Sequence, residues 1–299
     1  MAAFSTSLLF YPFTLPFLQL LVPLLFLIIP LTLHRSMPLL PLSQAATTAF
    51  KSVRLVATDM DGTLTTAGRF TPALLQTFKQ LAAVDIQVLI VTGRSAGWVS
   101  GLAHYLPVWG AIAENGGLLY VEGSHPATLA QTLLVPLSDL VRHRQQLAAV
   151  FQRLQVLFPA LAESDDNCFR LTDWTFDVQG LSTNELEAID RYCQCWGWGF
   201  TYSTIQCHLK LRSQDKAMGL QTVLQQYFPG YTAENLLAVG DSPNDESLFD
   251  TSRFPLSVGV ANVLDYSDRL LHLPAYVTTA AEGDGFLELA HLLLRSRQA

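Results

Sequence analysis

The sequence predicts an α/β fold in which a mainly parallel sheet carries helices on both faces. Short apolar runs alternate with longer segments of helical periodicity, and this alternation is typical of βαβ units. Three of the apolar runs, at 53–58, 88–91 and 236–240, each lead directly into a turn that is rich in Asp, Thr or Gly. From about residue 123 to residue 207 the pattern changes to long helices with strand candidates between them.

The first half of the chain shows the core pattern. In chain order we expect the strand 53–58, the helix 71–83, the strand 88–91, the strand 111–114 and, after the turn 115–117, the strand 118–122. Thr71 supplies a capping hydroxyl for the helix, and Pro72 suits its first turn.

The middle of the chain interrupts this pattern. Here we expect helices at 138–158 and 182–196, with strands at 169–172, 176–178 and 200–203. Ser182 and Glu185 have the spacing of a capping box, which fixes the start of the second helix. The core pattern then resumes with a helix at 217–227, opened by Asp215 and Lys216, and with the strand 236–240.

Two acidic residues follow the first strand. Because side chains alternate along a strand, Asp59 and Asp61 point to the same side, and Gly62 lets the backbone turn away. Two carboxylates this close repel each other, so we expect a cation between them or a proton on one of them. The pattern suggests one nucleophile and one proton shuttle.

Polar residues also follow the other strands of the core pattern. Thr92 follows the strand 88–91, Lys216 opens a helix, and Asp241 and Asp245 follow the strand 236–240. A nucleophile, a hydroxyl, a cation and metal-binding carboxylates are the groups that phosphoryl transfer through an aspartyl phosphate requires. We expect them to meet, because ligands bind outside the carboxyl ends of parallel strands.

These segments resemble the four motifs of the haloacid dehalogenase superfamily of phosphohydrolases. DMDGT at 59–63, TGR at 92–94, Lys216 and GDSPND at 240–245 occur in the family's order. VGVAN at 258–262 and GDGF at 283–286 resemble its Cof-type branch, which includes sugar phosphatases, sucrose-phosphate phosphatase and mannosyl-phosphoglycerate phosphatase.

The resemblance covers roughly residues 53–294 and implies a Rossmann-like parallel-sheet core with an inserted α/β cap domain. We therefore expect four segments: a hydrophobic N-terminal segment and linker at 1–51, the first part of the core at 52–122, the cap at 123–207 and the second part of the core at 208–299.

The resemblance also assigns roles to the motif residues. It implies that Asp59 attacks phosphorus and that Asp61 protonates the leaving group and then activates water. Mg²⁺ is the expected cofactor, because the implied ligands are all oxygens. These ligands are the Asp59 carboxylate, the Asp61 backbone carbonyl, Asp241 and Asp245.

Further residues are expected to hold the phosphoryl oxygens of the substrate. Thr92 and Lys216 are the first of these. The other expected substrate contacts, which include two backbone amides, are Gly62, Thr63, Gly93, Asn115 and Asn244.

Several of these assignments have open alternatives. The Thr92 hydroxyl could bond only to backbone. Lys210 could reach the phosphate in place of Lys216, and Asp245 could chiefly cap a helix. The candidates for reading the substrate in the cap, which packing or solvation would explain equally well, are Arg170, Asp173, Trp174, Tyr202 and His208.

The implied activity is the hydrolysis of a small phosphorylated metabolite, with a sugar phosphate as the expected substrate. A phosphomutase with the same Asp pair is one alternative, and a catalytically silent membrane-associated binding protein is another. The net charge of −7 and the absence of a basic block argue against nucleic acid as a partner. We expect the four cysteines to be reduced, structural thiols, and the sequence leaves the oligomeric state open.

The N-terminal segment is a separate question. Residues 8–33 are almost wholly apolar and long enough to span a bilayer, although four prolines interrupt them. Two readings stay open: a membrane anchor, or a start site placed too far upstream, with Met37 as the true start. Because Arg35, Lys51 and Arg54 follow the run, the positive-inside rule would leave the catalytic part of an anchored protein in the cytoplasm. We therefore expect a cytoplasmic enzyme under both readings.

Overall fold

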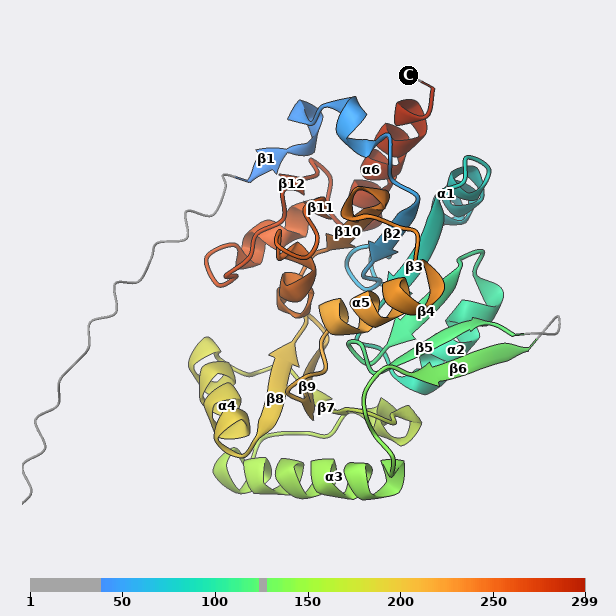
Figure 1. The fold of residues 1–299 in the computed structure, drawn as a ribbon. Coiled ribbons are helices and arrows are strands. Elements are labelled where there is room, and N and C mark those ends of the chain that lie inside the picture. Colours follow the sequence, from blue (N-terminus) through green and yellow to red (C-terminus); the bar gives the residue numbers. More distant parts are fainter. Residues whose placement is uncertain (1–38, 124–127, 299) are drawn as a thin grey trace, which may run out of the picture. The chain divides into compact units, whose positions relative to one another are not determined.

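The computed structural model describes residues 39–123 and 128–298, and it confirms the α/β fold (Figure 1). The described helices are α1 Pro72–Ala82, α2 Ala96–Tyr105, α3 Leu140–Leu157, α4 Thr183–Cys195, α5 Lys216–Tyr227 and α6 Glu282–Ser296. The described strands are β1 Leu40–Pro41, β2 Leu55–Thr58, β3 Gln87–Val91, β4 Gly110–Ala113, β5 Leu118–Glu122, β6 Leu129–Leu133, β7 Trp174–Asp177, β8 Trp198–Tyr202, β9 Gln206–Leu211, β10 Leu236–Gly240, β11 Ser257–Gly259 and β12 Tyr276–Val277.

The larger sheet has nine strands in the order β1-β12-β11-β10-β2-β3-β4-β5-β6. All neighbours from β1 to β4 are parallel, whereas β5 and β6 add antiparallel pairs at one edge. β10, β2, β3 and β4 are therefore four adjacent parallel strands whose carboxyl ends lie at the same edge of the sheet.

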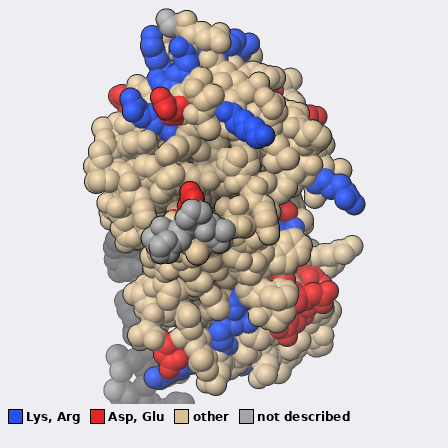
Figure 2. All heavy atoms as spheres, turned by 90° about the vertical axis from the view of Figure 1, so that its right-hand side faces the viewer, with Lys and Arg blue, Asp and Glu red and all other residues tan. Residues whose placement is uncertain are grey.

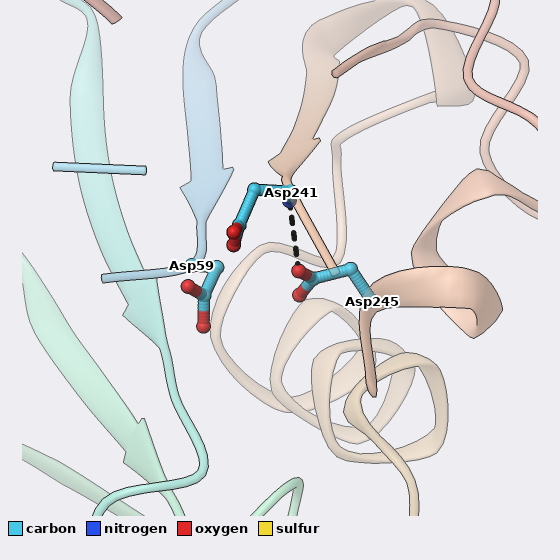
Figure 3. Close-up of side chains that lie close together, drawn as sticks. All are labelled: Asp59, Asp241 and Asp245. Atoms are coloured by element: carbon cyan, nitrogen blue, oxygen red, sulfur yellow. Dashed lines mark hydrogen bonds between the residues drawn. The ribbon is translucent and has the colours of Figure 1, made fainter. Parts of the chain in front are cut away.

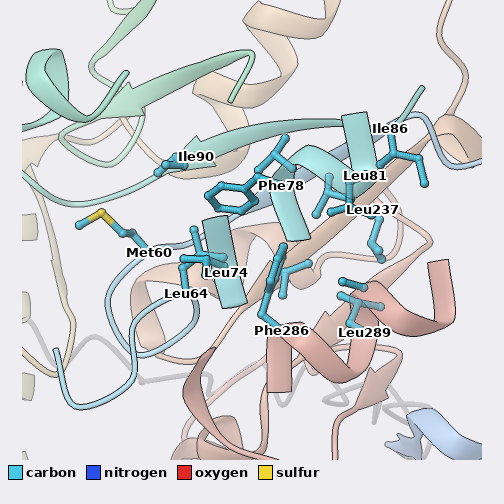
Figure 4. Packing of buried hydrophobic residues seen from close by; sticks show 14 of the residues in the cluster. Met60, Leu64, Leu74, Phe78, Leu81, Ile86, Ile90, Leu237, Phe286 and Leu289 are labelled. Atoms are coloured by element: carbon cyan, nitrogen blue, oxygen red, sulfur yellow. The ribbon is translucent and has the colours of Figure 1, made fainter. Parts of the chain in front are cut away.

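Helices cover both faces of this sheet because its central strands bury side chains in both directions. On one face α1, α2 and α6 contribute to a core in which the rings of Phe78 and Phe286 meet edge to face at 6.1 Å (Figure 4). On the other face α5 buries Leu220 and Val223 against the sheet. Burying one such side chain contributes roughly 1.5–3 kcal/mol, so the two cores hold the strand ends in place.

A second sheet of three antiparallel strands, in the order β7-β9-β8, forms its own layer with α3 and α4. Its core includes Phe151, Phe176 and the buried thiols Cys193 and Cys207. All four cysteines are free, but only Cys193 and Cys207 are buried as structural thiols would be, whereas Cys168 and Cys195 are exposed. The predicted capping box at Ser182 and Glu185 is present at the start of α4.

The limits of this second layer differ from the predicted limits 123 and 207. β6 pairs with β5 of the large sheet, so the core continues past residue 123 as an antiparallel hairpin. β9 pairs with β7 and β8, so residue 207 lies inside a strand of the small sheet. Strand pairing therefore extends the core at the first boundary and the small sheet at the second.

The predicted strand 169–172 is wrong. Residues Asp165–Phe169 form a 3-10 helix, and residues 171 and 172 form a bend. Polar side-chain contacts explain the difference. Asn167 forms two hydrogen bonds with the backbone of Thr175, at 2.6 and 3.0 Å, and the Arg170 guanidinium binds Asp166 and Asp173. These contacts take the place of a strand ladder.

The predicted linker before residue 52 also differs from the structure. β1 pairs with β12 at the edge of the large sheet, and Leu42 and Phe50 are buried in the core of the α1, α2 and α6 face. These apolar side chains gain more from burial than from exposure, which anchors the segment to the core. The predictions for residues 8–33 and for Met37 concern positions outside the described residues.

A helix that crosses a membrane must be both long and apolar. Among residues 39–123 and 128–298, no helix has both the length and the apolar character of a bilayer span. On the face shown in Figure 2, Lys and Arg side chains are scattered among uncharged residues.

Candidate active site

The polar residues of the motifs converge at the carboxyl edge of the large sheet. Asp59 follows β2, Asp241 follows β10, Thr92 follows β3, and Asn115 lies two residues after β4. The Asp59 backbone N–H donates to the Val239 carbonyl oxygen at 2.9 Å, which continues the β2–β10 ladder to the site. The register of adjacent parallel strands thus brings together residues that are far apart in sequence.

Three carboxylates form a buried cluster at these strand ends (Figure 3). Asp59, Asp241 and Asp245 each place one oxygen so that the three atoms lie within 4.8 Å of one another. The second Asp245 oxygen accepts hydrogen bonds from the backbone N–H groups of Asp241, at 2.9 Å, and Ser242, at 3.1 Å. Asp245 is therefore the third residue of a capping box whose N-cap is Ser242, and it is also a member of the carboxylate cluster. Metal binding by Asp245 stays a prediction.

Lys216 supplies a positive charge to the cluster. Its Nζ lies 2.5 Å from Asp59 Oδ1 and 2.6 Å from Asp245 Oδ1, and its side chain is fully buried. The alternative residue Lys210 instead donates to the Gln214 carbonyl oxygen. Although burial opposes it, attraction to Asp245 and Asp59 raises the pKa of Lys216 above its usual range, so the ammonium stays charged.

One ammonium does not balance three buried carboxylates. Burial raises the pKa of Asp59 to about 7 against the opposing attraction of Lys216, and the charges of Asp245 and Asp61 add to the rise. Burial and the charge of Asp59 raise the pKa of Asp241 well above its usual value. A divalent cation bound by these oxygens would remove the repulsion, and hard oxygen donors in this number suit Mg²⁺. The residues present therefore fit the expected cofactor.

This charge imbalance predicts how the stability of the metal-free protein depends on pH. In the unfolded chain Asp59 and Asp241 release their protons near pH 4, whereas in the folded protein Asp59 holds its proton until about pH 7. Because the folded state binds more protons, its stability falls as pH rises from about 4 to about 7. At pH 7.5, Mg²⁺ is expected to raise the melting temperature of EDTA-treated protein by about 4–8 °C, or about 2 kcal/mol for a domain of this size.

The measurement is a thermal melt with and without Mg²⁺ at pH 5 and pH 7.5. The matched control is Asp241→Asn, in which the Mg²⁺-dependent shift should shrink. An equal shift in this variant and in the parent protein would contradict the assignment of the cluster.

Asp61 lies beside the cluster but outside it. Its carboxylate forms a two-point ion pair with Arg94, from Nη2 to Oδ1 at 2.7 Å and from Nε to Oδ2 at 2.8 Å. The Arg94 guanidinium also stacks on the Trp98 ring at 4.9 Å from its centre. The carboxylate is thereby fixed in a cavity that Asp59 also lines. Metal binding by the Asp61 backbone carbonyl stays a prediction.

The expected phosphate contacts are only partly free in this state. The Thr92 hydroxyl accepts a hydrogen bond from the Arg94 backbone N–H at 3.2 Å, which leaves its own proton available to a ligand. The Gly62 amide donates to Thr65 Oγ1 at 3.0 Å, and the Thr63 amide donates to the Met60 carbonyl oxygen at 3.3 Å. Phosphate binding by these two amides would require the loop to rearrange.

Asn115 and Asn244 lie side by side. The Asn244 Nδ2 donates to Asn115 Oδ1 at 3.1 Å. The Asn115 Nδ2 is buried and has no hydrogen-bond partner among the described residues. A buried hydrogen-bond donor without a partner costs free energy. Among the expected phosphate contacts, the Asn115 amide would therefore gain most from a bound ligand.

Gly62 is required by the geometry of the loop. Its φ is +79°, and a Cβ at this position would lie 2.6 Å from Asp241 Oδ2. Asn262, which was not among the predicted site residues, donates from Nδ2 to the same Asp241 oxygen at 2.7 Å and to the Gly62 carbonyl oxygen at 3.1 Å. The segment 258–262 was a family signature in the sequence, and it could have identified this residue.

Glu114 is a second residue that the sequence analysis missed. Its buried carboxylate accepts hydrogen bonds from the backbone N–H of Ala96 at 2.9 Å, from that of Leu171 at 3.0 Å, and from both the N–H and the hydroxyl of Thr172 at 2.6 and 2.7 Å. Burial and the nearby charge of Asp173 raise the pKa of Glu114 to about 7. This carboxylate joins the large sheet to the segment that leads into β7.

Residues of the small sheet close the site. A cavity of about 10 Å³ lies between Asp59, Asp61 and Thr92 on one side and Ser203 and His208 on the other. A second cavity of about 230 Å³ reaches Lys216, Asn115 and Asn244 from the side of Lys210. The smaller volume is about that of one water molecule, so this cavity as it stands does not hold a phosphate ester.

Known proteins resemble this chain in sequence. Residues 56–134 match the sequence model of a family described as haloacid dehalogenase-like hydrolase. A phosphoglycolate phosphatase of Methanothrix thermoacetophila is 27% identical over 248 residues, which cover 79% of this chain and 95% of that protein.

Solved structures show the same fold. The sucrose-phosphatase of Synechocystis, solved with sucrose and phosphate, aligns with a TM-score of 0.58 and 19% identity over 81% of this chain and 98% of its own. The C-terminal domain of the C. albicans trehalose-6-phosphate phosphatase aligns with a TM-score of 0.63 and 14% identity over 87% of this chain and 99% of its own. The family match over residues 56–134, the relatives and the convergent motif residues agree, and together they support a haloacid dehalogenase-like phosphatase.

Proposed function

We propose that this phosphatase is Mg²⁺-dependent and hydrolyses a small phosphorylated metabolite, namely a sugar phosphate, through an aspartyl phosphate on Asp59. One observation carries the proposal. The Asp59 carboxylate is held at the carboxyl end of β2 between an ammonium and two further carboxylates, in a cavity that also contains Asp61. This arrangement provides a nucleophile and a separate proton donor.

In the first step an Asp59 oxygen forms a bond to phosphorus, and the bond between phosphorus and the leaving oxygen breaks. Asp61, protonated and released from Arg94 when the ester binds, gives its proton to that oxygen. In the second step water attacks phosphorus, Asp61 takes the proton of the water, and the bond between phosphorus and Asp59 breaks to release inorganic phosphate. Lys216 and the Thr92 hydroxyl stabilise charge on the phosphoryl oxygens, with Asn115 as a further donor.

Asp59, Asp241 and Asp245 would hold the Mg²⁺. When bound, the ion supplies positive charge that neutralises the phosphoryl oxygens and the carboxylates around them. Lys216 meanwhile orients the Asp59 carboxylate and opposes the rise in its pKa, which favours the ionised form that the nucleophilic role requires.

Two classes of substrate are supported by the comparisons. Sugar phosphates are favoured by the solved sucrose-phosphatase, and phosphoglycolate is favoured by the relatives of that name. We propose that the small sheet with α3 and α4 acts as a cap, since its residues complete the cavity around Asp59. Leaving-group selection would then depend on the cap, which must open to admit substrate.

The test is phosphate release from a panel of sugar phosphates, polyol phosphates and phosphoglycolate, with Mg²⁺ and with EDTA. Free phosphate as the product supports hydrolysis, whereas an isomeric phosphate ester would indicate the phosphomutase alternative. Activity that is unaffected by EDTA would refute Mg²⁺ dependence.

Asp61→Asn is expected to lower turnover of alkyl phosphates by about 10²–10⁴-fold, because proton transfer to the leaving oxygen is lost. p-Nitrophenol leaves without a proton, so the first step with p-nitrophenyl phosphate should be affected much less. Rapid mixing should then show a burst of about one equivalent of p-nitrophenol per site, followed by slow turnover. Equal losses on both substrates, with no burst, would contradict the role of Asp61.

We also propose a cytoplasmic location, on the basis of the charges that follow the apolar run in the sequence. Fractionation of the native source, with an antibody against the catalytic region, would test both this location and membrane association.

A further inference from the structure

A histidine of the small sheet lies directly against the Thr92-Gly93-Arg94 turn of the large sheet. His208 is on β9, is 1% exposed, and lines the cavity of about 10 Å³ together with Asp61 and Thr92. A Cβ on Gly93 would lie 3.0 Å from both Cε1 and Nε2 of the ring. A side chain at residue 93 would therefore crowd the imidazole, which would have to shift by a few tenths of an ångström.

The proton on the other ring nitrogen is fixed by its surroundings. His208 Nδ1 lies 2.9 Å from Asp173 Oδ2. The Arg170 guanidinium binds both oxygens of Asp173, at 2.9 and 3.0 Å, so Asp173 is an ionised carboxylate and can only accept. Nδ1 must therefore carry a proton and donate it, which fixes the orientation of the ring.

Arg170 ties this pair to the catalytic edge. Its Nη1 also donates to the Gly93 carbonyl oxygen at 2.9 Å, while Nη2 binds Asp166 at 2.9 Å and Gln206 at 2.8 Å. The charge of the guanidinium is thus balanced by the carboxylates of Asp166 and Asp173 within the protein. Arg170 is not available to a substrate, and it acts by positioning Asp173 and, through it, His208.

The Nε2 of His208 is different, because it makes no hydrogen bond within the described part of the chain. Burial lowers the pKa of His208 even though Asp173 opposes the change, and the positive charges of Arg170 and Lys210 act in the same direction as burial. The ring is therefore neutral at pH 7, and Nε2 presents a lone pair to the cavity. A hydrogen-bond acceptor in this position needs a donor.

We infer that His208 selects the leaving group: its Nε2 accepts a hydrogen bond from a hydroxyl group of the bound phosphate ester. This inference rests on the proposed function and narrows its substrate class to esters whose leaving group carries a hydroxyl near the ester oxygen. Polyol and sugar phosphates meet this condition. The carboxylate of phosphoglycolate does not, because two acceptors would face each other.

The position of the ring agrees with this assignment, because His208 lines the same cavity as Asp61 and Thr92. A histidine that served only to fill the core would not leave a polar atom facing this space beside Asp61 and Thr92.

The test compares three substrates: glycerol 1-phosphate with hydroxyls, phosphoglycolate with a carboxylate, and p-nitrophenyl phosphate with neither group. Two variants of the full chain are used with Mg²⁺. His208→Leu keeps most of the volume and removes the acceptor, whereas His208→Gln keeps a polar group near the position of Nε2. The readout is the ratio of kcat/KM for glycerol 1-phosphate to kcat/KM for p-nitrophenyl phosphate.

We expect this ratio to fall at least about tenfold in His208→Leu, as for the loss of a buried hydrogen bond, and to fall less in His208→Gln. A purely structural role would lower both rates together and leave the ratio unchanged, which would refute the inference. His208→Gln provides the same ratio if the Leu variant does not fold.

Other outcomes separate this inference from the proposed function. If phosphoglycolate loses the most in the variants, or if the parent enzyme hydrolyses phosphoglycolate but not glycerol 1-phosphate, then the hydroxyl assignment is wrong while the phosphatase remains. If the parent enzyme releases phosphate from none of the three, the proposed function fails together with the inference.

Discussion

Asp59→Asn is expected to abolish phosphate release, with a loss in kcat of at least about 10⁴-fold. The carboxamide keeps the size of the side chain but cannot form the acyl phosphate. The position is also part of the three-carboxylate cluster, so Mg²⁺ should bind more weakly as well. The measurement is single-turnover and steady-state phosphate release on p-nitrophenyl phosphate at saturating Mg²⁺.

The matched control is Asp268→Asn, because that side chain is 85% exposed and lies outside the cluster. It undergoes the same chemical change, and it should keep the turnover and melting temperature of the parent protein. Substantial turnover in a folded Asp59→Asn protein would refute the covalent mechanism.

Lys216→Met is expected to lower both stability and turnover. The ammonium is fully buried between Asp59 and Asp245, so its removal leaves two buried carboxylates without their partner. Breaking a buried ion pair on one side typically costs about 3–5 kcal/mol. Loss of the charge beside the phosphoryl group should lower kcat by about 10²–10³-fold, as for removal of one stabilising donor.

Urea unfolding in EDTA measures the first effect, and Lys79→Met on the exposed face of α1 is the matched control. Because Mg²⁺ can replace part of the missing charge, it should stabilise Lys216→Met more than it stabilises the parent protein. Unchanged stability of the variant in EDTA would show that Lys216 is not the partner of these carboxylates.

The sequence by itself was sufficient where function depends on local pattern. An apolar run with a following Asp or Thr predicts both a buried strand and a polar strand end, so the sites of Asp59, Thr92 and Asp241 could be inferred without coordinates. The parallel arrangement then brings these ends together, because adjacent parallel strands all end at the same edge.

Local pattern failed where pairing or side-chain contacts over longer distances decide the structure. The segment 169–172 has strand-forming residues, yet the Arg170 ion pairs and the Asn167 backbone contacts hold it as a 3-10 helix and a bend. The predicted linker is part of the core because the side chains of Leu42 and Phe50 are buried there. The predicted domain limits at 123 and 207 differ from the structure because β6 pairs with β5 of the large sheet and β9 pairs with β7 of the small sheet. The sequence of a strand does not show which neighbour it pairs with.

What the sequence alone determined is therefore the fold class and the position of Asp59, Asp241 and Lys216 at strand ends or a helix start, since short segments of sequence define each of these. Only the tertiary structure decided that Arg94 holds Asp61, that Glu114 joins the large sheet to the segment before β7, and that Asp173 orients His208 toward Gly93. Each of these contacts joins side chains 33 or more residues apart. These contacts are strong because packing buries the groups and brings their charges close together. The spacing of residues along the sequence shows neither the burial nor the distance between charges.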